Sequence, residues 1–204
     1  MLVSRRLFLA MPRAAAAASP AAAGQGDAPA GVIDRFYGVL LSVMQQAKAL
    51  SFDQRYARIA PAVAAAFNLP LMTRIAVGPD WTALDAAQQQ RLEAAFARYT
   101  ISEYAARFDG YDGERFDVTP TPIANPNGVV VASRIVKSNG EPVSINYLMR
   151  QDGGTSWKVI DVYLDGTISQ LAARRSEFVS VLQRSGADGL VQLIERRTAG
   201  LRRG

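Results

Sequence analysis

The sequence predicts an α+β protein in which helices pack on one face of a curved, four-stranded antiparallel sheet. Apolar residues follow the spacing of amphipathic helices from Val32, change to an alternating pattern near Gly110, and return to helical spacing near Ile168. The 204 residues give room for one domain of ordinary size behind a leader. We expect a leader at 1–23, a linker at 24–31, a single domain at 32–198 and a basic tail at 199–204.

The leader has the order of features of an export signal. Arg5 and Arg6 supply the positive start, an apolar stretch begins at Leu7, and Ala21–Ala23 is a small-residue cleavage context. The arginine pair also resembles a twin-arginine signal, so the twin-arginine route and the general secretory route both stay open. We expect an exported, soluble, extracytoplasmic protein. The alternative is a disordered, alanine-rich tail on a cytosolic protein.

Four helices are predicted ahead of the strands, over about 32–44, 51–67, 69–75 and 82–108. Ser51 and Gln54 form a capping box at the start of the second helix, in which each side chain bonds an otherwise unpaired backbone N–H. Pro61 can break or kink this helix. For the fourth and longest helix we expect Thr82 as the N-cap, with Asp85 in the capping-box position.

Four strands are predicted next, over 115–119, 128–137, 142–150 and 156–164. Asn139-Gly140 and Asp152-Gly153 are good signals for antiparallel hairpins, because both dipeptides accept the backbone angles of tight turns. The last strand is apolar on both faces, as a central strand covered on both sides requires. A regular alternation along it places Val159 and Tyr163 on one face.

Helical spacing resumes at Ile168 and continues to about Arg184, and Gly186 separates this helix from a last one over 188–197. The net charge is +5, but the body of the chain has no basic run of the kind that follows a phosphate backbone. We therefore expect no nucleic-acid partner. The arginines of the tail either contact an anionic membrane surface or belong to a frayed, solvated terminus.

The chain contains neither His nor Cys. It therefore cannot form a Ser-His-Asp triad, a thiol nucleophile, a thiolate cluster, a disulfide or a typical zinc site. An enzyme built on this sequence would have to use carboxylates, Lys, Tyr or Ser. Composition thus favours a binding protein, and we expect neither metal nor organic cofactor.

An ordered set of short stretches resembles one protein family. The stretches are Phe67-Asn68, Met72, Val77-Gly78, Trp81, Phe96, Tyr104-Ala105, Trp157–Val162, Asp165-Gly166, Ser169, Arg174–Phe178 and Gly186. Together they cover most of 32–195 and are similar to the MlaC/toluene-tolerance family of periplasmic phospholipid-binding proteins, with its hopanoid-biosynthesis-associated (HpnM-like) branch. Asn68 departs from the family pattern, which usually has an acidic residue there. A helix cap carried by a carboxylate is therefore in doubt at that point.

The resemblance implies a nuclear-transport-factor-like cone with an apolar pocket for lipid acyl chains. Proteins of this family carry lipid between membrane-bound partners, commonly an inner-membrane ABC-type complex and an outer-membrane complex. The implied ligand is a phospholipid or a hopanoid. The residues that we expect to line the pocket and bind lipid are Met72, Ile75, Trp81, Tyr99, Tyr104, Val143, Ile145, Tyr147, Val159 and Tyr163. For each of them, ordinary core packing is the alternative.

An enzyme and a ligand-free adaptor of an envelope complex are the alternatives to a carrier. Cone-shaped folds can hold a carboxylate base and a tyrosine donor in an apolar cavity, and Asp161 with Tyr163 would be that pair here. Glu103, next to Tyr104, is the second carboxylate of interest. We expect structural roles instead, with Asp161 bonded to a neighbouring loop or to Arg174 and Glu103 exposed on a helix surface. No set of catalytic residues is complete.

Overall fold

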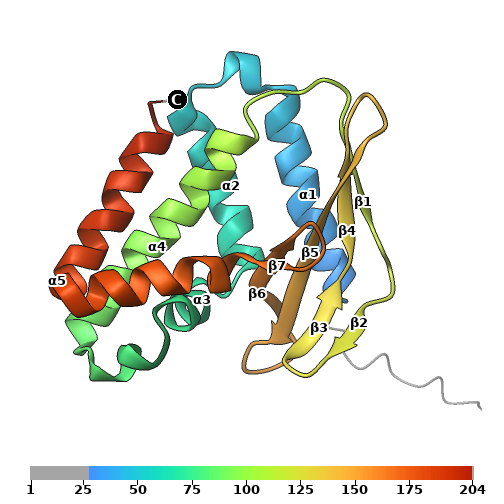
Figure 1. The fold of residues 1–204 in the computed structure, drawn as a ribbon. Helices are drawn as coiled ribbons and strands as arrows, with labels where there is room; N and C mark the ends of the chain where they lie inside the picture. Colours follow the sequence, from blue (N-terminus) through green and yellow to red (C-terminus); the bar gives the residue numbers. More distant parts are fainter. Residues whose placement is uncertain (1–27, 204) are drawn as a thin grey trace, which may run out of the picture.

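The computed structural model describes residues 28–203. The predicted leader and the first half of the predicted linker, 24–27, lie outside the described residues, and the first helix already begins at Pro29 within the second half. Helices gather on one side of the molecule and a twisted antiparallel sheet stands on the other (Figure 1). The predicted α+β class is confirmed. No helix within 28–203 is both long and apolar enough to cross a membrane.

Local capping sets where several of the helices begin. Ser51 and Gln54 form the predicted capping box, since the Gln54 N–H donates to Ser51 Oγ at 3.2 Å and the Ser51 N–H donates to Gln54 Oε1 at 2.8 Å. Asn68 caps the next helix by accepting the Leu71 N–H at 3.0 Å, so an amide takes the place of the carboxylate. The helices are α1 Pro29–Gln45, α2 Phe52–Ala66, α3 Leu69–Val77, α4 Ala86–Arg107 and α5 Gln170–Leu201, with 3-10 turns η1 Ala47–Ala49 and η2 Gly78–Ala83.

The longest predicted helix before the strands begins later than expected. Asp85 is the N-cap of α4, and its capping-box partner is Gln88, whose N–H donates to Asp85 Oδ1 at 2.8 Å. Thr82, the predicted N-cap, lies within η2 and donates to the Pro79 carbonyl at 3.2 Å. The prediction placed the box three residues too early, because Thr82–Asp85 and Asp85–Gln88 both fit the capping pattern.

Within 28–203 the sheet has seven strands where four were predicted. They are β1 Arg115–Val118, β2 Ile123–Asn125, β3 Gly128–Val131, β4 Ser133–Val136, β5 Pro142–Gln151, β6 Trp157–Leu164 and β7 Ile168–Ser169. The predicted strand 128–137 is divided at Ala132 into β3 and β4, which pair with successive parts of β5. β6 pairs with the other edge of β5, so β5 is central. Both predicted hairpin turns lie between paired strands, and Gly140 and Gly153 have positive φ.

A β-bulge in β6 changes which of its side chains face the helices. Leu148 pairs with Asp161 and the next residue, Met149, pairs with Val159, which leaves Ile160 as an extra residue. Val159 and Val162 therefore point to the helix side, whereas Tyr163 points to the opposite face. The expectation that Val159 and Tyr163 share a face is wrong, because that prediction assumed an unbroken alternation.

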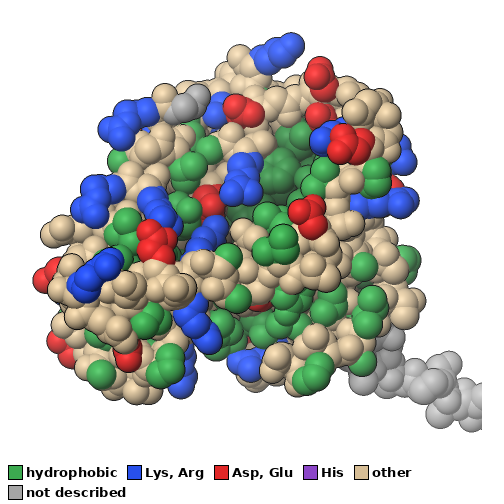
Figure 2. All heavy atoms as spheres, in the orientation of Figure 1, with side chains coloured by type: hydrophobic (Ala, Val, Ile, Leu, Met, Phe, Trp, Pro, Cys, Tyr) green, Lys and Arg blue, Asp and Glu red, His purple; other side chains and the backbone are tan. Residues whose placement is uncertain are grey.

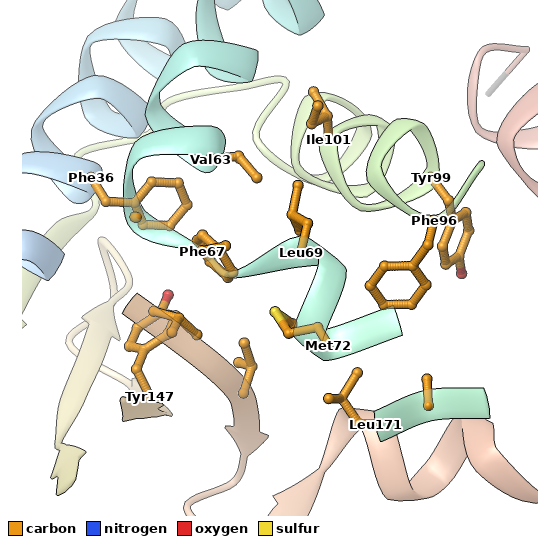
Figure 3. Close-up of a cluster of buried hydrophobic side chains, with 14 of the residues drawn as sticks. Phe36, Val63, Phe67, Leu69, Met72, Phe96, Tyr99, Ile101, Tyr147 and Leu171 are labelled. Carbon is orange, nitrogen blue, oxygen red and sulfur yellow. The ribbon is translucent and has the colours of Figure 1, made fainter. Parts of the chain in front are cut away.

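The core lies between the sheet and the helices (Figure 3). Phe36 of α1 sits at its centre, with ring centroids 5.2 Å from Phe67 and 5.1 Å from Tyr104. Tyr147 of β5 and Met72 of α3 approach the same cluster from the sheet and from the helix layer. This aromatic packing fixes α1, α3 and α4 against the concave side of β5.

Gly186 divides α5 into two arms, as the sequence predicts. Its φ of +65° is one that glycine adopts readily, and the chain bends there so that the second arm returns along α4. Arg91 pairs with Asp188 at 2.6 Å, which holds the second arm to α4. At its end, Arg202 pairs with Asp53 at the start of α2. The proposed membrane contact of the tail stays a prediction.

Candidate functional site

A cavity of about 360 Å³ opens between the helix side of the sheet and helices α3, α4 and α5. Figure 2 shows this side of the molecule, with a hollow whose floor is hydrophobic and whose rim carries side chains of both charges. Its apolar walls are Phe67, Met72, Tyr104, Phe108, Ile135, Val143, Ile145, Tyr147, Val162, Leu164 and Leu171. A hollow of this kind suits a ligand that is mostly hydrocarbon.

A second hollow, of about 530 Å³, lies between α1, α2 and the start of β6. Its charged lining residues are the basic Arg35, Arg58 and Lys158, and most of its α2 wall is short alanine side chains. It contains none of the ten predicted lipid-binding residues. The first cavity, between sheet and helices, is therefore the candidate site.

The mouth of the candidate site holds a largely buried ion pair between two helices. Arg174 Nη2 of α5 donates to both carboxylate oxygens of Glu103 on α4, at 2.9 and 2.7 Å. The two side chains are only 16% and 13% exposed. Tyr99 donates to the same carboxylate at 3.1 Å, and Arg107 approaches it at 3.5 Å. Glu103 is therefore not the exposed helix-surface charge that we expected, because the first arm of α5 packs over it.

Burial and the Glu103 carboxylate both act on Tyr99. Burial raises the pKa of Tyr99, and the neighbouring negative charge raises it further. The Arg174 guanidinium lies over the Tyr99 ring, 5.2 Å from its centroid. Tyr99 is thus a neutral support for the ion pair, and it does not line the cavity.

A chain of hydroxyl groups runs from the cavity floor into the core. Tyr37 bonds Ser133 Oγ at 2.7 Å, and Ser133 donates its only proton to the Ile145 carbonyl. Tyr37 must therefore be the donor to Ser133. Tyr37, Tyr104 and Tyr147 lie close enough for each hydroxyl to affect the pKa of the others. Burial raises the pKa of Tyr37 to about 12, and it raises the pKa of Tyr104 and Tyr147 as well.

Tyr104 and Tyr147, which line the cavity, are therefore neutral, because burial raises the pKa of both hydroxyls.

A model of the MlaC protein family matches residues 35–196, which is most of the chain. This chain belongs to the MlaC family. A solved structure with a similar fold is the phospholipid-binding protein from Ralstonia solanacearum, in complex with a phospholipid. The TM-score is 0.74 at 23% identity, and the match covers 86% of this chain and 99% of the other. No curated protein matches this chain.

In this MlaC-family chain, five of the ten predicted lipid-binding residues line the cavity. They are Met72, Tyr104, Val143, Ile145 and Tyr147. The strand residues among them follow the helix-facing positions of β5 and the part of that strand that pairs with β4. Alternation along β5 was enough to find them, because that strand carries its own residues in regular order.

The other five predicted residues do not line this cavity. Trp81 is buried in η2, and Val159 is fully buried where its carbonyl accepts the Asn68 N–H at 2.9 Å. Ile75 lies towards the second half of α3, where its carbonyl accepts two bonds from Arg175. Tyr99 supports the ion pair, as described above, and the bulge turns Tyr163 to the other face of the sheet. Core packing, the alternative for each, accounts for the first two.

The structure adds wall and rim residues that the sequence analysis missed. Val162 and Leu164 enter the cavity because the bulge shifts the alternation of β6. Leu171 begins α5, and Phe108 follows the end of α4. Phe108 had a usable signal, since it falls on the apolar face of the predicted long helix. No local signal identifies Val162.

Asp161 anchors the start of α5 and does not face the cavity. Its carboxylate accepts the Val162 N–H at 2.8 Å, the Leu171 N–H at 3.3 Å and the Ser169 hydroxyl. A negative charge at a helix N-terminus is favourable. Of the two predicted partners, the loop is therefore correct and Arg174 is not. The structure does not bring Asp161 and Tyr163 together at the cavity. Residues 28–203 also contain no group of three or more His, Cys, Asp or Glu that could hold a metal.

Proposed function

We propose that this protein is a soluble periplasmic lipid carrier that shields the acyl chains of a phospholipid in the cavity between its sheet and its helices. The observation that carries this proposal is the apolar cavity with a charged mouth, formed by Tyr147, Val162 and Leu164 on the sheet and by Met72 and Leu171 on the helices. Membership of the MlaC family and the phospholipid in the similar Ralstonia structure support it.

The hydrophobic effect explains why a carrier needs such a wall. Each methylene group moved out of water contributes about 0.8 kcal/mol, so ten buried methylenes of an acyl chain contribute about 8 kcal/mol. A volume of about 360 Å³ lies near the lower end of ligand pockets, which span roughly 300 to 1,000 Å³. We expect the cavity to widen when a second chain enters, by movement of α3 and the first arm of α5 against the sheet.

The proposed membrane partners rest on what the family resemblance implies. An exported carrier would receive lipid at one membrane complex and deliver it to another, with an inner-membrane ABC-type complex and an outer-membrane complex as the implied partners. A hopanoid is the second ligand to consider, since the sequence also resembles the hopanoid-associated branch.

Native mass spectrometry of the mature protein, purified from a periplasmic fraction without detergent and followed by lipid extraction, tests the proposal. We expect phospholipid mass on the protein. Leu164→Trp, which fills the cavity, should remove it, whereas Ile123→Trp, at an exposed position on β2, should not. A bound polycyclic triterpenoid would assign the ligand to the hopanoid class. Bare protein that also takes up no added lipid would contradict the carrier function and leave the adaptor.

A further inference from the structure

The charged side chains that line the cavity are evenly divided by sign. They are Glu103, Arg107, Asp165 and Arg174, two acidic and two basic. The walls beneath them are apolar, so a lipid whose chains occupy the cavity leaves its headgroup among these four. The balance of charge at the mouth therefore bears on which headgroup fits.

The two arginines have bonding capacity left after their contacts with Glu103. Arg174 uses Nη2 for both of its bonds to the carboxylate, and within 28–203 its Nε and Nη1 have no hydrogen-bond partner. Arg107 is 59% exposed and reaches Glu103 only at 3.5 Å. Since Glu103 neutralises one guanidinium, the group keeps one positive charge and several N–H donors. Arginine donors in this arrangement suit a phosphate.

Asp165 supplies the opposite charge from a different element. It lies in the turn between β6 and β7, is exposed, and has no hydrogen bond or ion pair with any other described residue. The turn holds it in the left-handed region, with φ of +48°, which fixes the backbone from which its carboxylate projects. An unpaired carboxylate on the rim of a lipid cavity favours a cationic group in the ligand.

One further polar group lies deeper, beside the ion pair. Thr100 lines the cavity one turn before Glu103 and is 5% exposed, and its hydroxyl has no partner among the described residues. A buried hydroxyl without a partner is unfavourable, so an acceptor from the ligand would stabilise it. The ester carbonyl of a glycerolipid, which lies just below the phosphate, is such an acceptor. A hydrocarbon ring system has none.

We infer that the mouth of the cavity selects an ester-linked phospholipid with a zwitterionic headgroup, with the phosphate at Arg107 and Arg174 and the amine at Asp165. This inference rests on the proposed function. A headgroup that carries a phosphate but no amine leaves Asp165 unpaired next to a negative ligand, so its binding is weaker.

A competition between two phospholipids tests the inference. The mature protein is incubated with vesicles of equal phosphatidylethanolamine and phosphatidylglycerol with identical acyl chains, and the lipid that copurifies with it is quantified. We expect the wild type to enrich phosphatidylethanolamine about 1.4- to fivefold, the range for one exposed ion pair. Asp165→Asn should bring the ratio close to that of the vesicles, and asparagine tolerates the left-handed backbone there. Asp152→Asn, at the exposed Asp-Gly turn of the β5–β6 hairpin, is the matched control and should keep the enrichment.

Arg107→Gln separates the phosphate contact from the amine contact. It should lower the uptake of both phospholipids while the ratio between them changes little. A wild type that takes up both lipids in the vesicle ratio, or an Asp165→Asn variant that keeps the enrichment, would overturn the headgroup inference and leave the carrier function intact. A wild type that takes up neither lipid would overturn the carrier function itself.

Discussion

Removing the arginine of the buried ion pair should destabilise the protein much more than removing an equivalent exposed arginine. In Arg174→Met, the Glu103 carboxylate keeps its Tyr99 and Arg107 contacts but loses two bonds of 2.9 and 2.7 Å. Methionine replaces most of the length of the side chain, so the loss falls mainly on the charge. The first arm of α5 is thereby detached from α4 at the mouth of the cavity.

The size of the effect follows from the burial of the pair. Breaking a fully buried pair by removing one partner costs about 3 to 5 kcal/mol, whereas exposed pairs contribute about 0.2 to 1 kcal/mol. Glu103 and Arg174 are 13% and 16% exposed, near the buried limit but not at it. The contact of Arg174 with the Tyr99 ring adds a smaller contribution. We therefore expect the free energy of unfolding to fall by about 2 to 3 kcal/mol.

Urea unfolding followed by circular dichroism measures this change, and Arg98→Met is the matched control. Arg98 of α4 also forms an ion pair with α5, since its Nη2 lies 2.9 Å from Glu195 Oε1. In that pair, however, both side chains are about half exposed. We expect its loss to cost less than about 1 kcal/mol. In Glu103→Gln/Arg174→Met, where no buried charge is left alone, part of the loss should be recovered. Equal destabilisation by Arg174→Met and Arg98→Met would refute the reasoning from burial.

Three further predictions concern the cap, the unpaired hydroxyl and the tyrosines. Asn68→Ala should lower the free energy of unfolding by about 0.5 to 2 kcal/mol, because it removes the cap of α3, whereas Asn68→Asp keeps a capping oxygen and should keep the stability. Equal losses for the two variants in urea titrations would show that the cap is not the cause. Thr100→Val removes a buried hydroxyl that has no partner among the described residues. The lipid-free protein should therefore become more stable by about 1 kcal/mol, while its retention of phospholipid falls. Lower stability of the lipid-free variant would contradict this. Burial raises the pKa of Tyr37 from 10.0 to about 12. Between these two pH values the native state therefore keeps a proton that the unfolded chain has lost. The free energy of unfolding that Tyr37 contributes is present below pH 10 and is lost as the pH rises from 10 to 12. Tyr37→Phe should flatten the fall in stability between pH 9 and pH 11, and an unchanged slope in urea titrations would show that Tyr37 does not contribute.

The parts of the fold that the sequence predicts correctly depend on neighbours along the chain. The Ser51–Gln54 capping box, the Asn139-Gly140 hairpin and the bend at Gly186 each involve residues a few positions apart, and each is present. Their physical causes are local backbone hydrogen bonds and φ angles. Three of the predicted lipid-binding residues line the cavity for a similar reason, because regular alternation along β5 places Val143, Ile145 and Tyr147 on the helix side.

Composition and periodicity thus determine an α+β protein without thiol or imidazole chemistry, and the ordered stretches determine its family. The tertiary structure alone decides the cavity and its charged mouth. The bulge at Ile160 arises from the pairing of β6 with β5, and Glu103 meets Arg174 across 71 positions of the chain. A cavity is volume that packed elements fail to fill, so its walls depend on how sheet and helices meet rather than on the pattern of any one segment.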